Sequence, residues 1–478
     1  MMNWEKLLCE KRETISVKKS TDNRNEFRRD YHRIIGSASF RRLQDKTQVF
    51  SLDRGDFVRT RLTHSLEVSS FAKSLGQACF IEIQNKYSGT DIGVTDLQID
   101  KICCILECAG LIHDIGNPPF GHFGEDTIRE WFRNNLSSLK LDGIEISKII
   151  DQRMKNDLLN FEGNAQALRL LTKLHYLVDD NGMHLTYGLL NTIIKYPVSS
   201  VGINKKSGNI KDKKMGYYYS EEKIFNDITS STGAGGNRYP LVYLLEASDD
   251  IAYCTADTED AVKKGLLTYD ILLRELNDEE SFSVLDTDEK RKKYEEIVKK
   301  LTKCLDRAKA REIKNPEVNA VQNWIIQAQN ELINEAKNGF VNNYMSIMDG
   351  TFKGEVLTSE KEAGSALIMA LRRISVKYIY SAPEITKLEL SANTMLCFLL
   401  DHLVPAAVKG ESAKSANSIE KKYLSLISDN YIRAYNTAAK GADDREKLYL
   451  RLLLVTDYIC GMTDSFAKDL YRKLNGII

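Results

Sequence analysis

The sequence predicts an all-α protein, and two observations support this fold class. Only seven prolines interrupt the 478 residues, and apolar residues recur at intervals of three and four, the spacing of a helix face that is buried against a core. The apolar fraction of 42% and the charged fraction of 28% are those of ordinary globular proteins, so a disordered chain and a coiled-coil fibre are poor descriptions of the whole. We therefore expect few strands and a single compact helical unit over residues 1–478.

A buried helix is predicted over residues 97–112. The run LQIDKICCILECAGLI is mainly apolar, Thr95 and Asp96 precede it as candidate caps, and Gly116 lies behind it. A helix that is apolar on most of its surface is typically enclosed by other elements. We therefore expect His113, which follows this helix directly, to lie in the interior of the protein.

Further helices and one irregular segment follow along the chain. A second helix is predicted from Pro240, a favoured first-turn residue, to Gly265. The highly charged segment 275–345 has helical spacing and predicts solvent-facing helices that pack by one stripe, and 445–474 predicts one or two amphipathic helices. The segment 198–239 is an excursion of different composition, rich in Gly, Ser, Lys and Asn. This composition predicts a loop or a small hairpin.

Charge and cysteine content narrow the functional classes. Lys plus Arg equals Asp plus Glu at 67 each, so no net positive field favours nucleic acid, and the basic stretches 24–33 and 203–214 are interpreted as solvated faces. The nine cysteines contain no C-x-x-C pair, which is typical of reduced and mostly buried thiols. No apolar run reaches about 18 residues, and the charged N-terminus is unlike a secretory signal. We expect a cytoplasmic protein without a membrane partner.

Polar side chains interrupt the predicted core at three places. His113 and Asp114 end the apolar helix, His64 lies in the segment RLTHS, and Asp249 and Asp250 interrupt the run LVYLLEASDDIAY. Unpaired charges there would be costly, and a metal ion held by two imidazoles and two carboxylates would explain them. Such ligands suit Mn, Fe, Ni, Co or Zn, or Mg with added water. A His–Asp pair by itself is more often a hydrogen-bonded core histidine.

The order and the amino-acid sequences of these segments resemble those of a known protein family. The pattern of His, then His–Asp, then Asp is similar to the signature of the HD superfamily, and more narrowly the motifs resemble those of the deoxyguanosinetriphosphate triphosphohydrolases. The segments that carry the resemblance are FRRLQDKTQVF (40–50), RTRLTHSLEV (59–68), AGLIHDIGNPPFGHFGE (109–125), NFEGNAQ (160–166), LTYGLL with IKYP (185–197), EASDDIAYCTADTEDA (246–261) and YICGMTDSFA (458–467). The region 270–440 matches only weakly.

The resemblance implies a metal centre and a residue pair that activates water. The implied metal ligands are His64, His113, Asp114 and Asp249, for a divalent ion such as Mn, Mg or another transition metal. His122 and Glu125 are the implied catalytic residues, with the carboxylate orienting the imidazole as general base. The implied reaction splits a deoxynucleoside triphosphate, dGTP first among the candidates, into deoxynucleoside and inorganic triphosphate.

The helix that carries the last implied ligand also carries substrate contacts. Asp249, Tyr253 and Asp257 are four residues apart and so share one helix face. Because the family uses the first Asp of the pair as the ligand, Asp250 is expected to point elsewhere, to a supporting partner or a cap.

The resemblance also implies how the substrate is held. Arg61 and Lys195 would balance phosphate charge, the first with two parallel donors and the second as a point charge. Tyr253 would crowd the 2′ position of the sugar and thereby reject ribonucleotides. Arg42 and Lys46 are weaker candidates. The full set of implied substrate contacts is Gln48 (at the 3′ hydroxyl), Arg61, Asn164, Lys195, Tyr196, Tyr253 and Asp257.

Domain organisation and partners follow from the same resemblance. It implies an HD catalytic core at about 28–265, with 266–478 completing the substrate pocket and making oligomer contacts. It further implies a homo-oligomer, with a hexamer as one candidate. The sequence holds no signal that decides whether a second dNTP or single-stranded DNA acts as an activator.

Two alternatives stay open at this stage. The same metal site serves HD phosphohydrolases that act on alarmones or cyclic nucleotides, and a degenerate HD protein could instead sense nucleotides or bind single-stranded nucleic acid. The long motifs around His122 and Asp249 disfavour the first, and the presence of every implied ligand disfavours the second.

Overall fold

The computed structural model of the chain describes residues 1–477 apart from 14–23, 51, 53, 54, 56, 91, 176–181 and 411–417. Within this part of the chain the protein is built of helices, with one antiparallel pair of two-residue strands in which Lys140 faces Glu145. The predicted all-α class is confirmed.

The elements up to the end of the second predicted helix are α1 (Trp4–Leu7), α2 (Glu26–Ile35), α3 (Ala38–Arg41), the 3-10 helix η1 (Arg42–Asp45), α4 (Arg61–Lys86), α5 (Asp96–Ile112), α6 (Gly121–Asn135), β1 (Lys140–Leu141), β2 (Ile144–Glu145), α7 (Ile146–Ile149), α8 (Gln152–Leu159), α9 (Gly163–Arg169), the π-helix η2 (Leu170–Leu174), α10 (Tyr187–Ile193), the 3-10 helices η3 (Ile210–Asp212) and η4 (Tyr219–Glu221), α11 (Glu222–Ser231) and α12 (Pro240–Lys263).

The remaining elements are α13 (Tyr269–Leu276), α14 (Glu279–Phe282), α15 (Asp288–Ala310), α16 (Pro316–Asn342), α17 (Tyr344–Met348), α18 (Ala363–Ile374), the π-helix η5 (Ser375–Tyr380), α19 (Pro383–Lys409), α20 (Ser418–Leu424), α21 (Asp429–Ala438), α22 (Asp444–Cys460) and α23 (Asp464–Leu474).

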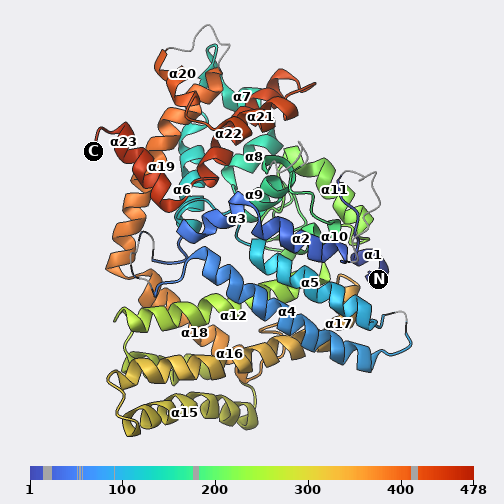
Figure 1. The fold of residues 1–478 in the computed structure, drawn as a ribbon, viewed down its shortest axis with the longest axis vertical. Coiled ribbons are helices and arrows are strands. Elements are labelled where there is room, and N and C mark those ends of the chain that lie inside the picture. The colour runs from blue at the N-terminus through green and yellow to red at the C-terminus, as the bar shows by residue number, and fades with distance from the viewer. Residues whose placement is uncertain are drawn as a thin grey trace.

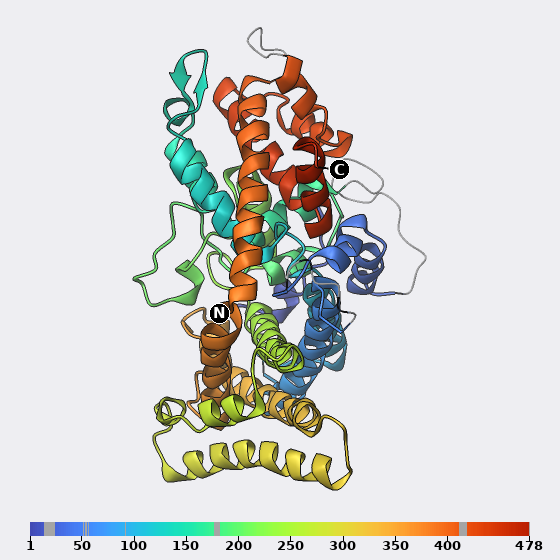
Figure 2. The ribbon, with the colours of Figure 1, turned by 90° about the vertical axis from the view of Figure 1, so that its left-hand side faces the viewer.

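Three long helices form the centre of the molecule. α4 packs along α5, and α12 lies against both. Figure 1 shows α16 below α12 and α15 outermost at that end, while α20 to α22 and α7 gather at the opposite end. Figure 2 shows α19 running lengthwise between the two ends, where it packs on α6, α22 and α23. The centre of this arrangement is where the predicted polar residues meet.

Local sequence explains how the central helices begin and end. The hydroxyl of Thr95 accepts a hydrogen bond from the backbone N–H of Gln98, whose side chain bonds back to Thr95, so α5 begins with a capping box. Thr60 caps α4 in the same way, and Pro240 occupies the first turn of α12. The predicted ends of α5 and α12 are thereby confirmed, and the predicted amphipathic segment 445–474 forms two helices, α22 and α23.

The excursion at 198–239 differs in part from its prediction. It contains a long loop, but within it the described residues form no hairpin; the segment instead includes the helix α11 and the short helices η3 and η4. Most of its lysines precede α11 in the chain and its glycines lie on both sides of that helix, while the buried face of α11 is apolar, with Ile224, Phe225 and Ile228. The Gly- and Ser-rich composition of the whole window concealed this short amphipathic helix.

One helix differs from the expectation that no segment is long and apolar enough to span a membrane. α19 is long and apolar enough to cross a membrane by length and composition, with a mean hydropathy of 1.3 over its most apolar window, and 56% of that window is buried in the protein. A mostly buried core helix passes the same test, so the observation is weak evidence for a membrane. The cytoplasmic location stays a prediction. All nine cysteines are free, and seven of them are buried.

Candidate active site

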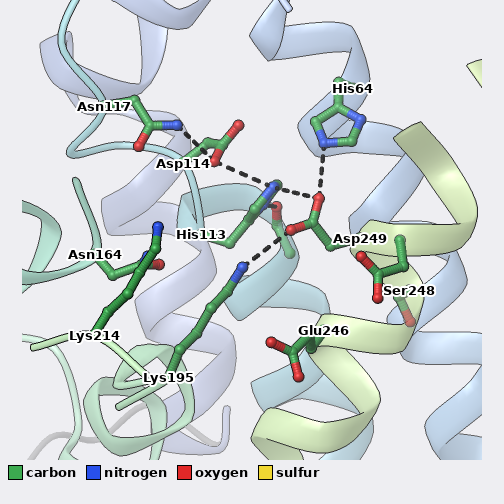
Figure 3. Close-up of polar contacts among 12 residues, drawn as sticks. His64, His113, Asp114, Asn117, Asn164, Lys195, Lys214, Glu246, Ser248 and Asp249 are labelled. Atoms are coloured by element: carbon green, nitrogen blue, oxygen red, sulfur yellow. Dashed lines mark hydrogen bonds and ion pairs between the residues drawn. The ribbon is translucent and has the colours of Figure 1, made fainter. Parts of the chain in front are cut away.

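Two imidazoles and a carboxylate converge where α4, α5 and α12 meet. One ligand atom from each of His64, His113 and Asp249 lies within 4.8 Å of the others. Asp249 Oδ1 lies 3.1 Å from His64 Nε2 and 3.3 Å from His113 Nε2, as Figure 3 shows. The two histidine rings are fully or almost fully buried, so the cluster forms a mixed nitrogen and oxygen site in the protein interior.

The hydrogen bonds of His113 fit a metal ligand. Its Nδ1 lies 2.8 Å from the carbonyl oxygen of Gly110, so this nitrogen carries the proton and donates to the carbonyl. The lone pair of the neutral ring is then on Nε2, which is buried, makes no hydrogen bond among the described residues and faces Asp249 Oδ1 at 3.3 Å. A partnered Nδ1–H with a free Nε2 is the usual arrangement of a ligating histidine. The residues therefore fit a divalent ion.

Asp114 lies beside this cluster and is turned toward cationic and amide groups. Its Oδ1 accepts a hydrogen bond of 2.8 Å from Asn117 Nδ2 and lies 3.7 Å from His113 Nε2. Its Oδ2 is bonded to the guanidinium of Arg61. Burial would raise the pKa of Asp114, but Arg61 and His113 outweigh burial and hold it far below its usual range. The carboxylate is thus ionised and available as a ligand.

Lys195 neutralises the second oxygen of Asp249. Its Nζ lies 3.0 Å from Asp249 Oδ2, and Figure 3 shows its side chain pointing from the loop after α10 toward the cluster. Burial would lower the pKa of Lys195, but Asp249 and Glu246 raise it strongly, so the ammonium stays charged. Glu246 is itself held by Arg238 at 2.6 Å. The site therefore keeps a fixed positive charge next to its carboxylates.

His122 and Glu125 form a second pair at the start of α6. Glu125 Oε2 lies 3.4 Å from His122 Nδ1, and Glu125 Oε1 accepts a hydrogen bond of 2.9 Å from the backbone N–H of Gly163. A Cβ at Gly163 would lie 2.4 Å from Glu125 Oε1, so only glycine permits this contact. Burial would raise the pKa of Glu125, but the hydrogen bond and charge of His122 lower it to about 2. The same bond raises the pKa of His122.

The two members of this pair differ in exposure. The side chain of Glu125 is buried, while that of His122 is 76% exposed and lines a cavity. The carboxylate is therefore fixed, and the imidazole is open to a substrate or to water.

The turn that joins the two clusters is tied to the end of the chain. Phe120 is in the left-handed region with φ of 64°, and its N–H donates to Asp464 Oδ1 at 2.9 Å. Gly121 follows with φ of 58°, and a Cβ there would lie 2.2 Å from the Arg61 guanidinium. Lys46, fully enclosed, donates to the carbonyls of Asn117 at 2.6 Å and Cys460 at 2.7 Å. Residues from both ends of the sequence thus hold this turn, here called the catalytic turn because it leads into His122, the catalytic residue that the resemblance implies.

A cavity of about 630 Å³ opens in front of these groups. All seven implied substrate contacts line it, together with Asp114, His122 and Asp249, while Arg42 and Lys46 do not. The implied contacts in its wall are Gln48, Arg61, Asn164, Lys195, Tyr196, Tyr253 and Asp257. The volume lies within the range of about 300–1,000 Å³ typical of ligand pockets.

The lining of α12 follows the expected helix face. Asp249, Tyr253 and Asp257 all face the cavity. Asp257 accepts a hydrogen bond of 2.6 Å from the hydroxyl of Tyr380, and burial raises the pKa of its carboxyl to about 7. Asp250 pairs with Arg372 at 2.6 Å, the supporting partner that the sequence left unnamed.

One wall of the cavity comes from residues that the motifs did not single out. Arg372 on α18 bonds Asp250 and also Glu355, at 2.9 Å. Tyr380 of η5 and four residues of α19 continue this wall, here called the C-terminal wall: Arg372, Tyr380, Ile385, Leu388, Glu389 and Ala392. Asn117, Lys213 and Lys214 were also missed, although Lys213 and Lys214 lie in the basic stretch 203–214 that was interpreted as a solvated face.

Two protein-family models match this chain. The HD domain model matches residues 61–177, which include His64, His113 and His122, and the phosphohydrolase-associated domain model matches residues 359–473. HD domains are metal-dependent hydrolases.

Curated relatives match along nearly the whole chain. A deoxyguanosinetriphosphate triphosphohydrolase-like protein of Listeria innocua is 46% identical over 482 residues, covering 100% of both chains. A deoxyguanosinetriphosphate triphosphohydrolase of Yersinia enterocolitica is 32% identical over 94% of this chain and 93% of its own. A probable deoxyguanosinetriphosphate triphosphohydrolase of Pseudomonas aeruginosa is 32% identical over 94% and 92%. By this full-length similarity the chain belongs to the deoxyguanosinetriphosphate triphosphohydrolase family of HD-domain phosphohydrolases.

Proposed function

We propose that this protein hydrolyses a deoxynucleoside triphosphate, with dGTP preferred, to the deoxynucleoside and inorganic triphosphate, using a divalent metal ion. One observation carries the proposal: a single cavity is lined by the carboxylates Asp114 and Asp249, by His122, by several cations and by an apolar wall. These are the parts needed to hold a polyphosphate, activate water and bind a base.

The metal ligands in this proposal are His64, His113, Asp114 and Asp249. The free Nε2 of His113 and the ionised carboxylates are the donors that a divalent ion such as Mn or Mg would use. When bound, the ion would supply Lewis-acid polarisation of a phosphoryl oxygen.

His122 is the proposed general base. Its exposed ring faces the cavity, and Glu125 fixes its orientation through Nδ1, which leaves Nε2 free to accept a proton from water. As His122 takes a proton from water, the water oxygen forms a bond to the α-phosphorus and the bond from that phosphorus to the 5′ oxygen breaks. The 5′ oxygen takes up a proton, so that the deoxynucleoside leaves with its 5′ hydroxyl and inorganic triphosphate is released. Correctly placed general bases contribute about 10² to 10⁴ in rate.

Fixed positive charges are the proposed partners of the phosphate chain. Arg61 and Lys195 line the cavity beside the metal ligands, and Arg372 and Lys214 line it as well. Arg61 Nε is buried without a hydrogen-bond partner in the described structure, so it retains a donor for a phosphate oxygen. Tyr196 and Asn164 complete this polar part of the lining.

Sugar and base occupy the remaining space in this proposal. The Oε1 atom of Gln48 is buried and has no partner within the described residues, which makes it a free acceptor for the 3′ hydroxyl. Tyr253, one turn after Asp249, is the wall that excludes a 2′ hydroxyl. Asp257 and Tyr380 brace this side of the pocket through their hydrogen bond.

Glu389 supports guanine as the preferred base. Its carboxylate lines the cavity among Ile385, Leu388 and Ala392, and no hydrogen bond or ion pair to it is seen within the described part of the chain. The Watson–Crick edge of guanine presents two adjacent N–H donors, whereas adenine presents an acceptor at the corresponding ring nitrogen. A partly enclosed acceptor between apolar side chains therefore favours guanine.

The same geometry supports the proposed division of the chain. Residues 28–265 supply the metal ligands and the catalytic pair, and residues 266–478 supply the C-terminal wall. The oligomeric state and activation by dNTP or single-stranded DNA stay predictions.

Product analysis tests the proposed function. The purified protein should be loaded with Mn or Mg and given each of the four dNTPs, singly and in pairs, and the products separated by ion-exchange chromatography. We expect deoxynucleoside and inorganic triphosphate in equal amounts, fastest from dGTP. Release of pyrophosphate with dNMP, or turnover only of cyclic nucleotides or alarmones, would contradict the proposal, as would nucleotide binding without any product.

A further inference from the structure

A second cavity of about 640 Å³ adjoins the first. It is lined by the loop before α11, the loop after α17 and one face of α18. Four residues belong to both cavities, so the two are continuous: Lys213, Lys214, Glu355 and Arg372. We call this second space the basic vestibule, defined by Lys205, Lys213, Lys214, Lys353, Glu355 and Arg372.

The vestibule has a surplus of positive charge. Glu355 supplies the carboxylate in the described lining, and this carboxylate is already paired with Arg372 at 2.9 Å. Lys214 is paired with Glu162. For Lys205, Lys213 and Lys353 no ion pair or hydrogen bond of the ammonium group is seen among the described residues. Three uncompensated ammonium groups around one hollow are a site of positive potential, which attracts anions.

The two loops hold these lysines in a fixed arrangement. The backbone N–H of Ile210 donates to the carbonyl of Lys353 at 3.1 Å, and that of Asn204 donates to the carbonyl of Asp212 at 2.9 Å. The first bond joins the loops to each other and the second closes the lysine-bearing loop on itself. The backbone positions from which these lysines extend are thus held by hydrogen bonds.

The lining indicates which anion fits. Among the described residues no aromatic side chain lines the vestibule, and Ile210 and Met369 are its large apolar residues. The first cavity, in contrast, offers Tyr253, Tyr380 and Phe123. A base needs such a surface to stack on, whereas a bare phosphate chain needs cations alone.

We propose that the basic vestibule binds linear polyphosphate and is the site that receives inorganic triphosphate as it leaves the metal centre. This inference rests on the proposed function, because it takes triphosphate to be the product. Lys213, Lys214 and Arg372 line both cavities, and Lys213 has no ion pair among the described residues, so a phosphate chain that moves from one cavity to the other stays beside cationic side chains.

A paired lysine substitution tests the vestibule. Lys205→Ala with Lys353→Ala removes two unpaired charges that line only the vestibule, and Lys206→Ala removes an exposed charge from the same loop that does not line it. Binding of inorganic tripolyphosphate is measured by calorimetry without divalent metal, which would chelate it. Loss of two exposed charge contacts should weaken binding about tenfold in the double variant, and binding by Lys206→Ala should stay within about twofold of wild type.

Product inhibition gives a second readout. Added tripolyphosphate should inhibit dGTP hydrolysis by the double variant less strongly than hydrolysis by the wild type or by Lys206→Ala. Equal tripolyphosphate affinity and equal inhibition in all three proteins would overturn the vestibule proposal. A double variant that loses binding of dGTP but keeps binding of tripolyphosphate would overturn it as well.

The two proposals fail in different ways. If hydrolysis releases no triphosphate, the proposed function is wrong, whatever the calorimetry shows. If triphosphate is released but the lysine variants bind it as the wild type does, only the vestibule proposal is wrong.

Discussion

The metal end of the cavity and its C-terminal wall are built in different ways. At the metal end each side chain is held by another: Asp114 by Arg61 and Asn117, and Asp249 by Lys195. At the wall, Glu389 lines the cavity and has no partner in the described structure, and its neighbours are apolar. A mutually bonded cluster cannot lose one member without leaving another unpaired, whereas Glu389 can change by itself.

This difference suggests a division of labour. The metal end is suited to chemistry, which requires fixed positions. The wall is suited to selecting a base, which requires only a matching acceptor and a shape. Variants of the metal end should therefore change turnover, and variants of the C-terminal wall should change the preference among nucleotides.

The largest effect is expected at the metal end, from Asp114→Ala. Loss of the carboxylate removes a proposed ligand and leaves Arg61 unpaired, so bound metal and turnover should both be abolished. Elemental analysis measures the bound metal, and the release of inorganic triphosphate measures turnover. Asp126→Ala is the matched control, because its side chain is 70% exposed. Stoichiometric metal with a near-normal rate in Asp114→Ala would refute the proposed ligand set.

His122→Ala separates chemistry from metal binding. The ring is the proposed base and not a ligand, so kcat should fall by about 10² to 10⁴ while metal content and dGTP affinity stay as in wild type. His32→Ala, an exposed histidine on α2, serves as control. If His122→Ala keeps the wild-type kcat, another group must activate the water.

Glu389→Gln tests the wall. Losing a charged acceptor for two N–H donors should reduce the ratio of kcat/KM for dGTP over dATP by about 10- to 100-fold. Metal content should not change. Glu384→Gln lies on the same helix, is exposed and does not line the cavity, so it should keep the wild-type ratio. An unchanged ratio in Glu389→Gln would mean that guanine is selected elsewhere.

The smallest effect is expected from Glu125→Gln, in the pH profile. The bond from Glu125 raises the pKa of His122, so in wild type the base becomes neutral only at higher pH. Removing the charge lowers that pKa, and the acid limb of the kcat profile should move to lower pH. The plateau should fall less than in His122→Ala, because only the orientation of the ring is weakened. An acid limb that stays in place would mean that His122 does not control it.

The sequence predicts the metal end better than the wall for a physical reason. His113, His122 and Asp249 lie at helix ends or at helical spacing within short motifs, so their local geometry follows from periodicity. The ion pair between Arg372 and Asp250 depends on how α18 packs on α12. No local sequence pattern encodes that packing. The helix α11 was missed because its apolar face is short and follows a Gly- and Lys-rich loop.

The links from Lys46 and Asp464 to the catalytic turn have a consequence for how the protein is made. The ribosome produces the segment around His113 early, but the carbonyl of Cys460 and the carboxylate of Asp464, which hold Lys46 and Phe120, come only near the end of the sequence. A nascent chain that stops short of Asp464 lacks these anchors. The catalytic turn therefore gains these contacts only after nearly the whole chain has been synthesised.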